Sequence, residues 1–340
     1  MSSLAKKEEI KEYSSQPLQK WKHIFEDELN KVDKVLLSLA KSEAELIPQL
    51  VEHIVKSGGK RLRPILVILA SKLCGYNEGD RHVNLAACIE FLHTATLLHD
   101  DVVDDSDLRR GKKTANNLWG NAPSILVGDF LLSRSFQLMA RDGSLEVLRV
   151  LSDTSAIITE GEVKQLIAIS DIDLNEEDYI EIISAKTAQL FAAACQIGAI
   201  IAGKNKAEED LLSSFGSNLG IAFQIVDDAL DYSAKQEELG KEIGDDFREG
   251  KVTLPVILSY LQSDEKGKAF WKEVIEKEEK SEDDLKEAIK LMSEQKILDQ
   301  VFDRARIYAD KAAGALMEFN GGEEKQAMLD LLEFSIDRPY

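Results

Sequence analysis

Acidic side chains gather at two places where an apolar, helix-forming stretch of the chain ends. The first stretch, 90–113, reads EFLHTATLLHDDVVDDSDLRRGKK and carries Asp100, Asp101, Asp104, Asp105 and Asp107. The second stretch, 220–232, reads GIAFQIVDDALDY and carries Asp227, Asp228 and Asp231. Both contain the spacing D-D-x-x-D, which places carboxylates on shared or adjacent faces of a helix. Because Mg²⁺ prefers oxygen ligands and takes one or two carboxylates per ion, this spacing predicts binding of divalent cations.

Repulsion between these carboxylates argues against a purely structural role. Like charges four residues apart repel, and carboxylates at a helix C-terminus oppose the helix dipole. One block alone is also typical of a solvated helix end, but two such blocks indicate a shared function. Since two helices of a bundle can face each other across one cavity, we predict that six carboxylates converge on a metal cluster, those of Asp100, Asp101, Asp104, Asp227, Asp228 and Asp231.

Basic residues stand close to both acidic blocks in the sequence. Lys60, Arg61 and Arg63 precede an expected helix N-terminus, a favourable place for a phosphate. Four others directly follow the first block, namely Arg109, Arg110, Lys112 and Lys113. Lys186 lies within a predicted helix, and Lys241 and Lys251 flank the loop after the second block. Taken singly, each is a surface charge by default. Together with two metal-binding blocks, they predict one or two bound diphosphate groups.

The elements that must position these residues are all predicted to be helices. No proline falls between Pro123 and Pro255, apolar residues recur at helical spacing from Leu85 to Ala95, and no stretch alternates in the manner of a strand. Caps are expected at Asn175 and Ser281. We predict helices over about 19–40, 47–57, 64–74, 81–105, 122–141, 144–169, 175–202 and 206–234. A further helix is expected to begin at 253–255, and short, solvated helices are expected within 264–296.

Length and composition favour one all-α domain over residues 1–340, with 1–18 as a loosely packed arm. The net charge of −20 argues against nucleic acid as a partner. The N-terminus lacks an apolar signal core, and the most apolar run, 190–202, is too short to span a bilayer. The cysteines share no C-x-x-C spacing, as expected of a cytoplasmic protein with reduced thiols. Peripheral contact with a membrane during product release is compatible with these features.

These motifs closely resemble the trans-prenyl diphosphate synthase family. The match covers about residues 45–260 and consists of GGKRLRP at 58–64, HTATLLHDDVVDDSDLRRGKKTAN at 93–116, EGEVKQL at 160–166, Lys186-Thr187, FQIVDDALDY at 223–232 and GKEIGDDFREGKVTLP at 240–255. The resemblance implies an isoprenoid-synthase-type helical bundle around a deep central cavity, usually as a homodimer. It also implies Mg²⁺-dependent, head-to-tail condensation of isopentenyl diphosphate onto an allylic diphosphate.

The resemblance assigns roles to single residues. Mg²⁺ would be held by six aspartates, Asp100, Asp101, Asp104, Asp227, Asp228 and Asp231. The predicted catalytic residues are Lys186 and five of these aspartates, all except Asp231. The allylic diphosphate would be bound by Arg109, Lys186, Thr187, Lys241 and Lys251, beside Gln224. Isopentenyl diphosphate would be bound by Lys60, Arg63, His93 and Arg110. The family's basic C-terminal tail is not matched, because Asp337 stands beside the only arginine there, so closure of the site by the tail is left open.

Product length depends in this family on the residues just before the first aspartate. Ala95 and Thr96 are small, whereas aromatic residues at these positions stop growth early in short-chain members. Phe91, Leu92 and Cys88 lie deeper, and Met139 is a candidate floor. The chain therefore resembles the long-chain subgroup, whose products of about C40 to C50 serve as quinone side chains. Two alternatives stay open: Ala95 and Thr96 only pack against a neighbouring helix, or the product is shorter, about C15 to C20.

Other classes of protein fit less well. A class I terpene cyclase shares the first D-D-x-x-D but does not need GGKRLRP. A di-iron carboxylate protein needs two E-x-x-H motifs, and Glu90 with His93 forms the only one in the chain. An EF-hand would need the frame D-x-[DN]-x-[DN]-G, which is absent. A catalytically silent partner subunit would carry a damaged acidic block, whereas both blocks are intact.

Overall fold

The computed structural model describes residues 20–21, 23–56, 59–109, 111–233 and 244–337. The predicted arm at 1–18 and the last three residues of the chain lie outside these ranges. The helices are α2 (Glu26–Leu39), α3 (Leu46–Lys56), α4 (Leu62–Leu73), α5 (Arg81–Val103), α6 (Ala115–Trp119), α7 (Asn121–Asp142), α8 (Leu145–Ile167), α9 (Glu176–Ile183), α10 (Gln189–Ile201), α11 (Lys206–Asp231), α12 (Asp245–Arg248), α13 (Leu254–Gln262), α14 (Glu265–Ile275), α15 (Glu282–Glu294), α16 (Ile297–Ala315) and α17 (Glu323–Ile336).

The prediction of an all-α fold is confirmed. The described strands are β1 (Leu108–Arg109) and β2 (Lys112–Lys113), which pair antiparallel directly after the first acidic block. They form a tight hairpin that turns the chain back toward the end of α5. The helix predicted over 175–202 is not uniform, because a π-helix, η1 (Ser184–Ala188), separates α9 from α10. Such π-turns are rare and often mark functional sites.

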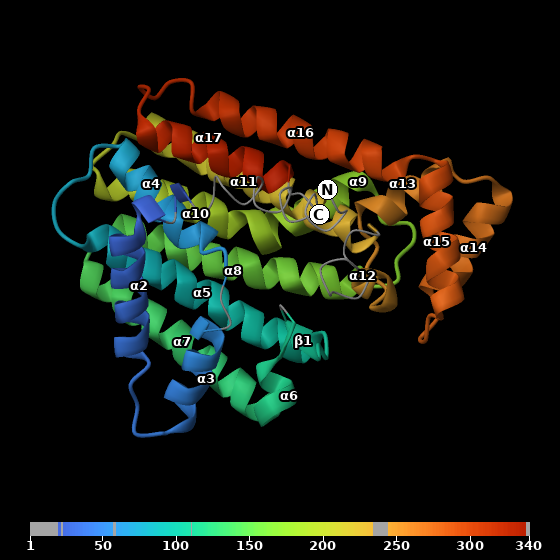
Figure 1. Ribbon diagram of the computed structural model, residues 1–340, viewed down its shortest axis with the longest axis horizontal. Helices are drawn as coiled ribbons and strands as arrows, with labels where there is room; N and C mark the ends of the chain where they lie inside the picture. Colours follow the sequence, from blue (N-terminus) through green and yellow to red (C-terminus); the bar gives the residue numbers. More distant parts are fainter. Residues whose placement is uncertain (1–19, 22, 57–58, 110, 234–243, 338–340) are drawn as a thin grey trace, which may run out of the picture.

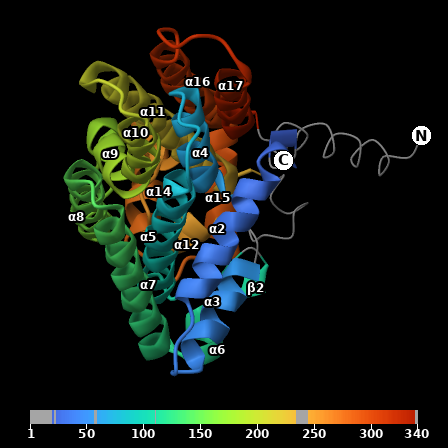
Figure 2. The same cartoon turned by 90° about the vertical axis from the view of Figure 1, so that its left-hand side faces the viewer.

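Helix α5 lies at the centre of the bundle and carries the first acidic block. It packs against α7 on one side and against α2 and α4 on the other (Figures 1 and 2). Helix α10 packs against both α4 and α11, and α11 in turn contacts α16. The two helices that end in acidic blocks, α5 and α11, are therefore separated by the layer of α4 and α10 over much of their length.

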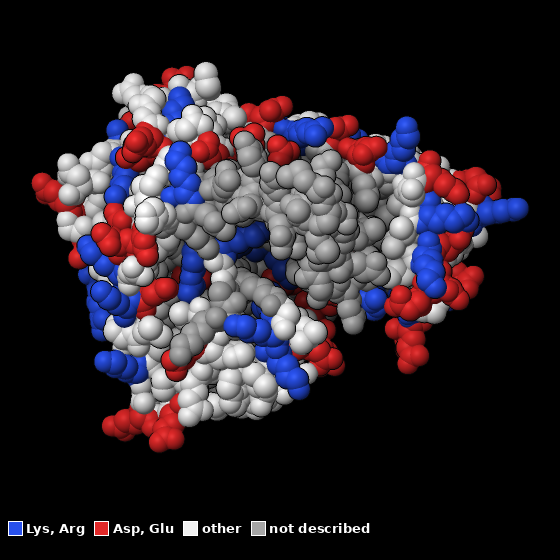
Figure 3. Space-filling view, viewed as in Figure 1, with Lys and Arg blue, Asp and Glu red and all other residues white. Residues whose placement is uncertain are grey.

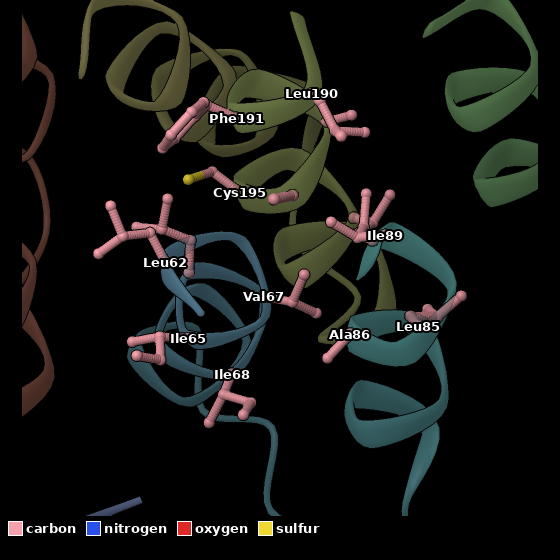
Figure 4. Packing of buried hydrophobic residues seen from close by; sticks show 14 of the residues in the cluster. Leu62, Ile65, Val67, Ile68, Leu85, Ala86, Ile89, Leu190, Phe191 and Cys195 are labelled. Atoms are coloured by element: carbon pink, nitrogen blue, oxygen red, sulfur yellow. The ribbon is translucent and has the colours of Figure 1, made fainter. Parts of the chain in front are cut away.

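Buried aliphatic side chains fix the angle between α4, α5 and α10. Figure 4 shows Leu62 and Val67 of α4 facing Ile89 of α5 and Phe191 and Cys195 of α10. Each fully buried side chain of this size contributes about 1.5–3 kcal/mol to the free energy of unfolding. The three cysteines, Cys74, Cys88 and Cys195, are buried and unbridged. This core explains why the stretch 64–74, rich in β-branched residues, is a helix.

A second cluster of buried residues joins α9, the second half of α11 and the helices α12 to α16. Trp271, Leu285 and Met292 are buried in this cluster. The helices of the charged stretch 264–296 therefore pack against the rest of the protein through a few apolar residues each, as predicted. The caps predicted at Asn175 and Ser281 are confirmed, and Ser281 forms a capping box with Asp284. Among the described helices, none combines the length and the hydropathy needed to cross a bilayer.

Candidate active site

The first acidic block lies at the C-terminal end of α5. Asp100 and Asp101 are in the last turn of the helix, and Asp104 is its C-cap. The Asp101 carboxylate is buried, accepts a hydrogen bond from Arg109 Nε at 2.8 Å and forms an ion pair with Arg109 Nη2 at 2.7 Å. Asn116 donates from Nδ2 to the Asp101 carbonyl at 3.0 Å. The hairpin after α5 thus returns Arg109 onto the acidic block, which places that guanidinium beside the predicted diphosphate.

Lys186, from the π-helix η1, points toward the same end of α5. Its Nζ lies 3.9 Å from Asp100 Oδ2, 2.7 Å from Glu162 Oε2 and 2.6 Å from Gln165 Oε1. Gly161 permits this approach, because a Cβ at that position would lie 2.7 Å from the Lys186 backbone nitrogen. The close packing of α8 on η1 therefore holds the ammonium group at the acidic block.

The second acidic block lies at the end of α11 and is largely buried. Asp228 accepts hydrogen bonds from Tyr179 Oη at 2.6 Å and from Gln224 Nε2 at 2.7 Å. Gln224 in turn accepts a hydrogen bond from Thr187 Oγ1 at 2.9 Å. These bonds connect two predicted allylic-site residues, Thr187 and Gln224, to a predicted metal ligand. Asp227 is exposed.

Asp231 is held by the start of α12. Its carboxylate accepts hydrogen bonds from the backbone N–H groups of Asp245 and Asp246, at 3.2 and 3.0 Å. Gly244, with a φ of 83°, takes the left-handed conformation that permits this turn. Asp245 and Asp246 thereby stand next to the second acidic block.

Lys251 joins the two acidic blocks. Its Nζ lies 3.1 Å from Asp104 Oδ2, at the end of the first block. Burial opposes the charge on this side chain, but the carboxylates of Asp246, Asp104 and Glu249 together raise the pKa of Lys251. Since Asp246 also contacts the second block through Asp231, a single ammonium group stands between both blocks. The ends of α5 and α11 therefore lie close to each other, on either side of Lys251.

Four carboxylates of the site, those of Asp100, Asp228, Asp231 and Asp246, have pKa values above the ordinary value of aspartate. Burial, together with repulsion by Glu162 and Asp104, raises the pKa of Asp100 to about 7, although Lys186 opposes the shift. Burial, with repulsion by Glu249 and Asp227, raises the pKa of Asp246 to about 6. Burial and the neighbouring Asp246 also raise the pKa values of Asp228 and Asp231. A site with only oxygen donors and excess negative charge fits divalent cations.

The convergence of six aspartates on one metal cluster stays a prediction. Within the described ranges, no three carboxylates lie close enough together to hold a metal ion by themselves. Lys186 and Lys251 are inserted among them instead, and Arg109 covers Asp101. The three aspartates of the first block thus each lie beside a cation, whereas Asp228 and Asp231 of the second block are held by uncharged donors.

A cavity of about 110 Å³ opens between α8, η1, α11 and the start of α13. Its lining includes residues predicted to bind the allylic diphosphate, together with Asp228 of the second block and the neighbouring Asp246, namely Lys186, Thr187, Gln224, Asp228, Asp246 and Lys251. Figure 3 shows Lys and Arg side chains around a hollow near the centre of one face, with Asp and Glu side chains spread over its margins.

The residues predicted to bind isopentenyl diphosphate meet at the start of α4. Arg63 Nη1 lies 3.2 Å from His93 Nε2, and its guanidinium stacks 4.2 Å above the Phe191 ring. Lys60 Nζ lies 5.1 Å from the Phe334 ring centroid. Arg61, which the sequence grouped with these cations, is used differently, because it forms an ion pair with Glu90. Arg110 and Lys241, also predicted to bind diphosphate, lie outside the described residues.

Several residues of the site were not given a role by the sequence alone. Glu162 and Gln165 contact the Lys186 ammonium group, and Asp246 raises the pKa of Lys251 through its charge. All three lie within motifs that resemble the family, so their presence was visible but their contacts were not. Tyr179 precedes the π-helix and carries no motif of its own. Lys112 and Lys113 are exposed on β2.

The residues predicted to set product length lie along the central core. Ala95 is 2 % exposed, and Leu92, Phe91 and Cys88 are buried below it on α5. Thr96 is partly buried, and its Oγ1 donates to the His93 carbonyl at 2.9 Å. Met139 is buried on α7, where Cys88 Sγ lies 3.4 Å from the Ser135 carbonyl. The role of these residues in product length stays a prediction.

The raised pKa values should make the metal-free protein less stable as the pH rises. The folded-state pKa of Asp100 is about 7 against an ordinary value of 3.8, so the folded form binds more protons between these values. Its contribution to the free energy of unfolding is full below the unfolded pKa and is lost as the pH rises through about 7. We expect the metal-free Tm to fall from about pH 6 to about pH 8, and added Mg²⁺ to restore part of it.

Differential scanning fluorimetry across this pH range would measure the effect. Asp100→Asn should reduce both the slope of Tm with pH and the response to Mg²⁺. A metal-free Tm that rises over the same interval would contradict the assignment.

Comparison with known proteins places this arrangement in a family. A polyprenyl synthetase family profile matches residues 44–292. The chain is 44% identical to octaprenyl diphosphate synthase of Haemophilus influenzae over 317 residues, 93% of this chain and 96% of that protein. A decaprenyl diphosphate synthase from Rhodobacter capsulatus has a crystal structure with a TM-score of 0.90 at 43% identity, covering 94% of this chain and 99% of that one.

A polyprenyl synthase from Caulobacter crescentus was crystallised with calcium and isoprenyl diphosphate. It matches with a TM-score of 0.91 at 44% identity, over 94% of this chain and 98% of that one. The match over nearly the whole chain, together with two aspartate blocks at one site, leads to one conclusion: the chain belongs to the polyprenyl synthetase family.

Proposed function

We propose that this protein condenses isopentenyl diphosphate head-to-tail onto an allylic diphosphate and releases a long-chain, all-trans polyprenyl diphosphate of about C40 to C50. The observation that carries the proposal is Lys251, which contacts Asp104 of the first block and interacts electrostatically with Asp246, whose backbone N–H donates to Asp231 of the second block. This arrangement supports a single site that both aspartate blocks would share. The octaprenyl and decaprenyl diphosphate synthases that the chain resembles support the long product.

The proposed cofactor is Mg²⁺, held by the aspartates at the ends of α5 and α11. Bound Mg²⁺ would act as a Lewis acid that stabilises the charge of the departing diphosphate. The oxygen-only donor set and the raised pKa values of Asp100, Asp228 and Asp231 support this choice. The calcium in the Caulobacter crescentus structure supports a divalent cation in the family.

The protein's own residues would bind and neutralise the allylic diphosphate. Lys186, Lys251 and Arg109 present three cationic groups around the ends of the two helices, and Thr187 adds a hydroxyl donor. Because these groups are fixed by contacts before the substrate arrives, they stabilise developing charge with little reorganisation. When the allylic C–O bond breaks, the electron pair stays with the diphosphate and the allyl group becomes a cation.

The second substrate would then supply the electrons for the new bond. Lys60, Arg63 and His93 would hold isopentenyl diphosphate at the start of α4, and its alkene would attack the allylic cation. Loss of one proton, which the released diphosphate would accept, then restores the double bond. No side-chain nucleophile is needed for this reaction, and apolar residues of α5 would surround the growing chain. The product would serve as a quinone side chain.

Elongation should be tested with the full chain, Mg²⁺, isopentenyl diphosphate and farnesyl diphosphate, with product length measured by mass spectrometry. A ladder of intermediates leading to about C40 to C50 is expected. Absence of elongation would refute the proposed reaction. A product that stops near C20 would refute the long-chain assignment and favour the shorter-chain alternative.

We also propose that the protein is a homodimer through the outer face of α7 and α8. Val163, Leu166 and Ile167 are spaced along one face of α8, and their exposed fractions are 51, 55 and 76%. Ile125 and Leu126 of α7 are exposed as well. Figure 2 shows α7 and α8 together at one edge of the molecule. Several exposed apolar side chains on neighbouring helices are typical of a protein–protein interface.

Sedimentation equilibrium should give about twice the chain mass of 37.9 kDa. Leu166→Glu should shift the protein toward the monomer, because it buries a charge at the interface. Leu261→Glu is the matched control, since Leu261 is equally exposed, at 62%, but lies on α13. Equal behaviour of the two variants would contradict this interface.

A further inference from the structure

Arg61 stands between two residues predicted to bind isopentenyl diphosphate, yet its own side chain is not directed to a ligand. Its Nη1 donates to Glu90 Oε1 on α5, and its Nη2 lies 3.2 Å from Asp33 Oδ1 on α2. The side chains of Arg61 and Glu90 are only 15 and 10% exposed. The guanidinium therefore ties the chain before α4 to two other helices.

The backbone at Arg61 adds to this constraint. Arg61 has a φ of 54°, the left-handed conformation that residues other than glycine rarely adopt. Such a conformation persists where surrounding contacts hold it. The Arg61 carbonyl accepts from the Ile65 N–H at 3.0 Å, so the strained residue also begins the first turn of α4. The orientation of Lys60 and Arg63 on either side thus depends on how Arg61 is held.

A second contact between α5 and the start of α4 lies beside the ion pair of Arg61 and Glu90. Glu90 and His93 are three residues apart and share one face of α5. Glu90 holds Arg61, and His93 contacts Arg63 at 3.2 Å. Between the two arginines, Leu62 is buried in the core near Phe191, on which the Arg63 guanidinium stacks (Figure 4). The face of α5 therefore sets the positions of alternate residues at the start of α4.

We propose that Arg61 and Glu90 are positioning residues for the second substrate. Their ion pair fixes the strained chain before α4, so that Lys60, Arg63 and His93 are aligned to bind one diphosphate. A buried ion pair often adds little to stability compared with apolar residues of similar volume. Its expected effect is therefore on binding rather than on folding. The inference rests on the proposed function, because it assigns that diphosphate to isopentenyl diphosphate.

The test replaces both partners together, as Arg61→Met with Glu90→Leu, so that no unpaired charge is buried. Displacement of bound groups by about 1 Å can cost about a hundredfold. We expect KM for isopentenyl diphosphate to rise about ten- to hundredfold. The allylic KM, kcat at saturating isopentenyl diphosphate, and Tm should stay close to wild type. Titration calorimetry with isopentenyl diphosphate, without added metal, should show the same loss of affinity.

The matched control is the ion pair at the opposite end of α4. Lys72 contacts Glu28 of α2 at 2.5 Å, and the two side chains are 30 and 18% exposed. Lys72→Met with Glu28→Leu should leave both KM values unchanged. The inference would be overturned if the Arg61/Glu90 double variant bound isopentenyl diphosphate as tightly as the wild type. It would also be overturned if the Lys72/Glu28 double variant lost as much affinity for isopentenyl diphosphate as the Arg61/Glu90 variant.

A milder variant covers the case in which the double variant does not fold. Glu90→Gln keeps the side-chain volume and a hydrogen bond to Arg61, so we expect a smaller rise in the same KM alone. A change of both KM values together would overturn the inference. If the wild type itself neither binds isopentenyl diphosphate nor elongates an allylic diphosphate, both the proposed function and this inference are wrong. If the wild type does both and the variants match it, only this inference fails.

Discussion

Replacing Asp104 with alanine should lower the elongation rate by roughly a thousandfold or more, since metal stabilisation of transition-state charge is worth several kcal/mol. Asp104 caps α5, and its carboxylate contacts Lys251 at 3.1 Å. Its removal would take away a predicted metal ligand and release Lys251 from the first block. Steady-state kinetics with saturating Mg²⁺ and both diphosphates would measure the loss.

Asp105→Asn provides the control for this experiment. Asp105 is the next residue in the sequence, is exposed, and has a φ of 50°. Asparagine tolerates that left-handed conformation, so the substitution removes one carboxylate without disturbing the turn. Its rate should stay within a few-fold of wild type. An Asp104→Ala rate within tenfold of wild type would contradict the metal role of Asp104.

A phenylalanine at position 96 should shorten the product from about C40–C50 to about C15–C20. Thr96 lies on α5 four residues before Asp100, and its hydroxyl is bonded back to its own helix. A small side chain there leaves room for chain growth along α5, whereas an aromatic ring would fill it. Mass spectrometry of products formed from farnesyl diphosphate would show the change directly.

Leu92→Phe tests the same idea one turn deeper. Leu92 is 3% exposed and lies about 6 Å further along α5. If the growing chain follows this helix, the product of Leu92→Phe should be longer than that of Thr96→Phe and shorter than that of wild type. An unaltered product from Thr96→Phe would mean that Thr96 only packs against a neighbouring helix.

Most of the helical framework could be predicted from the sequence, because local signals and packing agree. The stretch predicted over 206–234 is Lys206–Asp231, and 122–141 is Asn121–Asp142. Both begin and end near caps or glycines and carry a continuous apolar stripe. The two aspartate blocks were recognised for a similar reason. Their repulsion has no structural benefit, so the residue types alone indicated a function.

The details that depend on tertiary contacts could not be predicted. The π-helix at Ser184–Ala188 inserts an extra residue into a turn, which an apolar stripe of helical period does not reveal. Arg61 has the same chemistry as Lys60 and Arg63, and only the buried Glu90 on a distant helix separates its role from theirs. Tyr179 is near Asp228 through folding alone, 49 residues away in the chain.

The pairing of Lys186 with Glu162 and of Lys251 with Asp104 also bears on the order in which the first substrate and its metal arrive. Each ammonium group is already satisfied, so a bare diphosphate must compete with a carboxylate for it. A cation held by Asp104 would take that carboxylate from Lys251 and leave Lys251 with Glu249, whereas Lys186 would keep Glu162. Prior binding of the metal would therefore make Lys251 more available to a diphosphate, through an exchange of ionic partners.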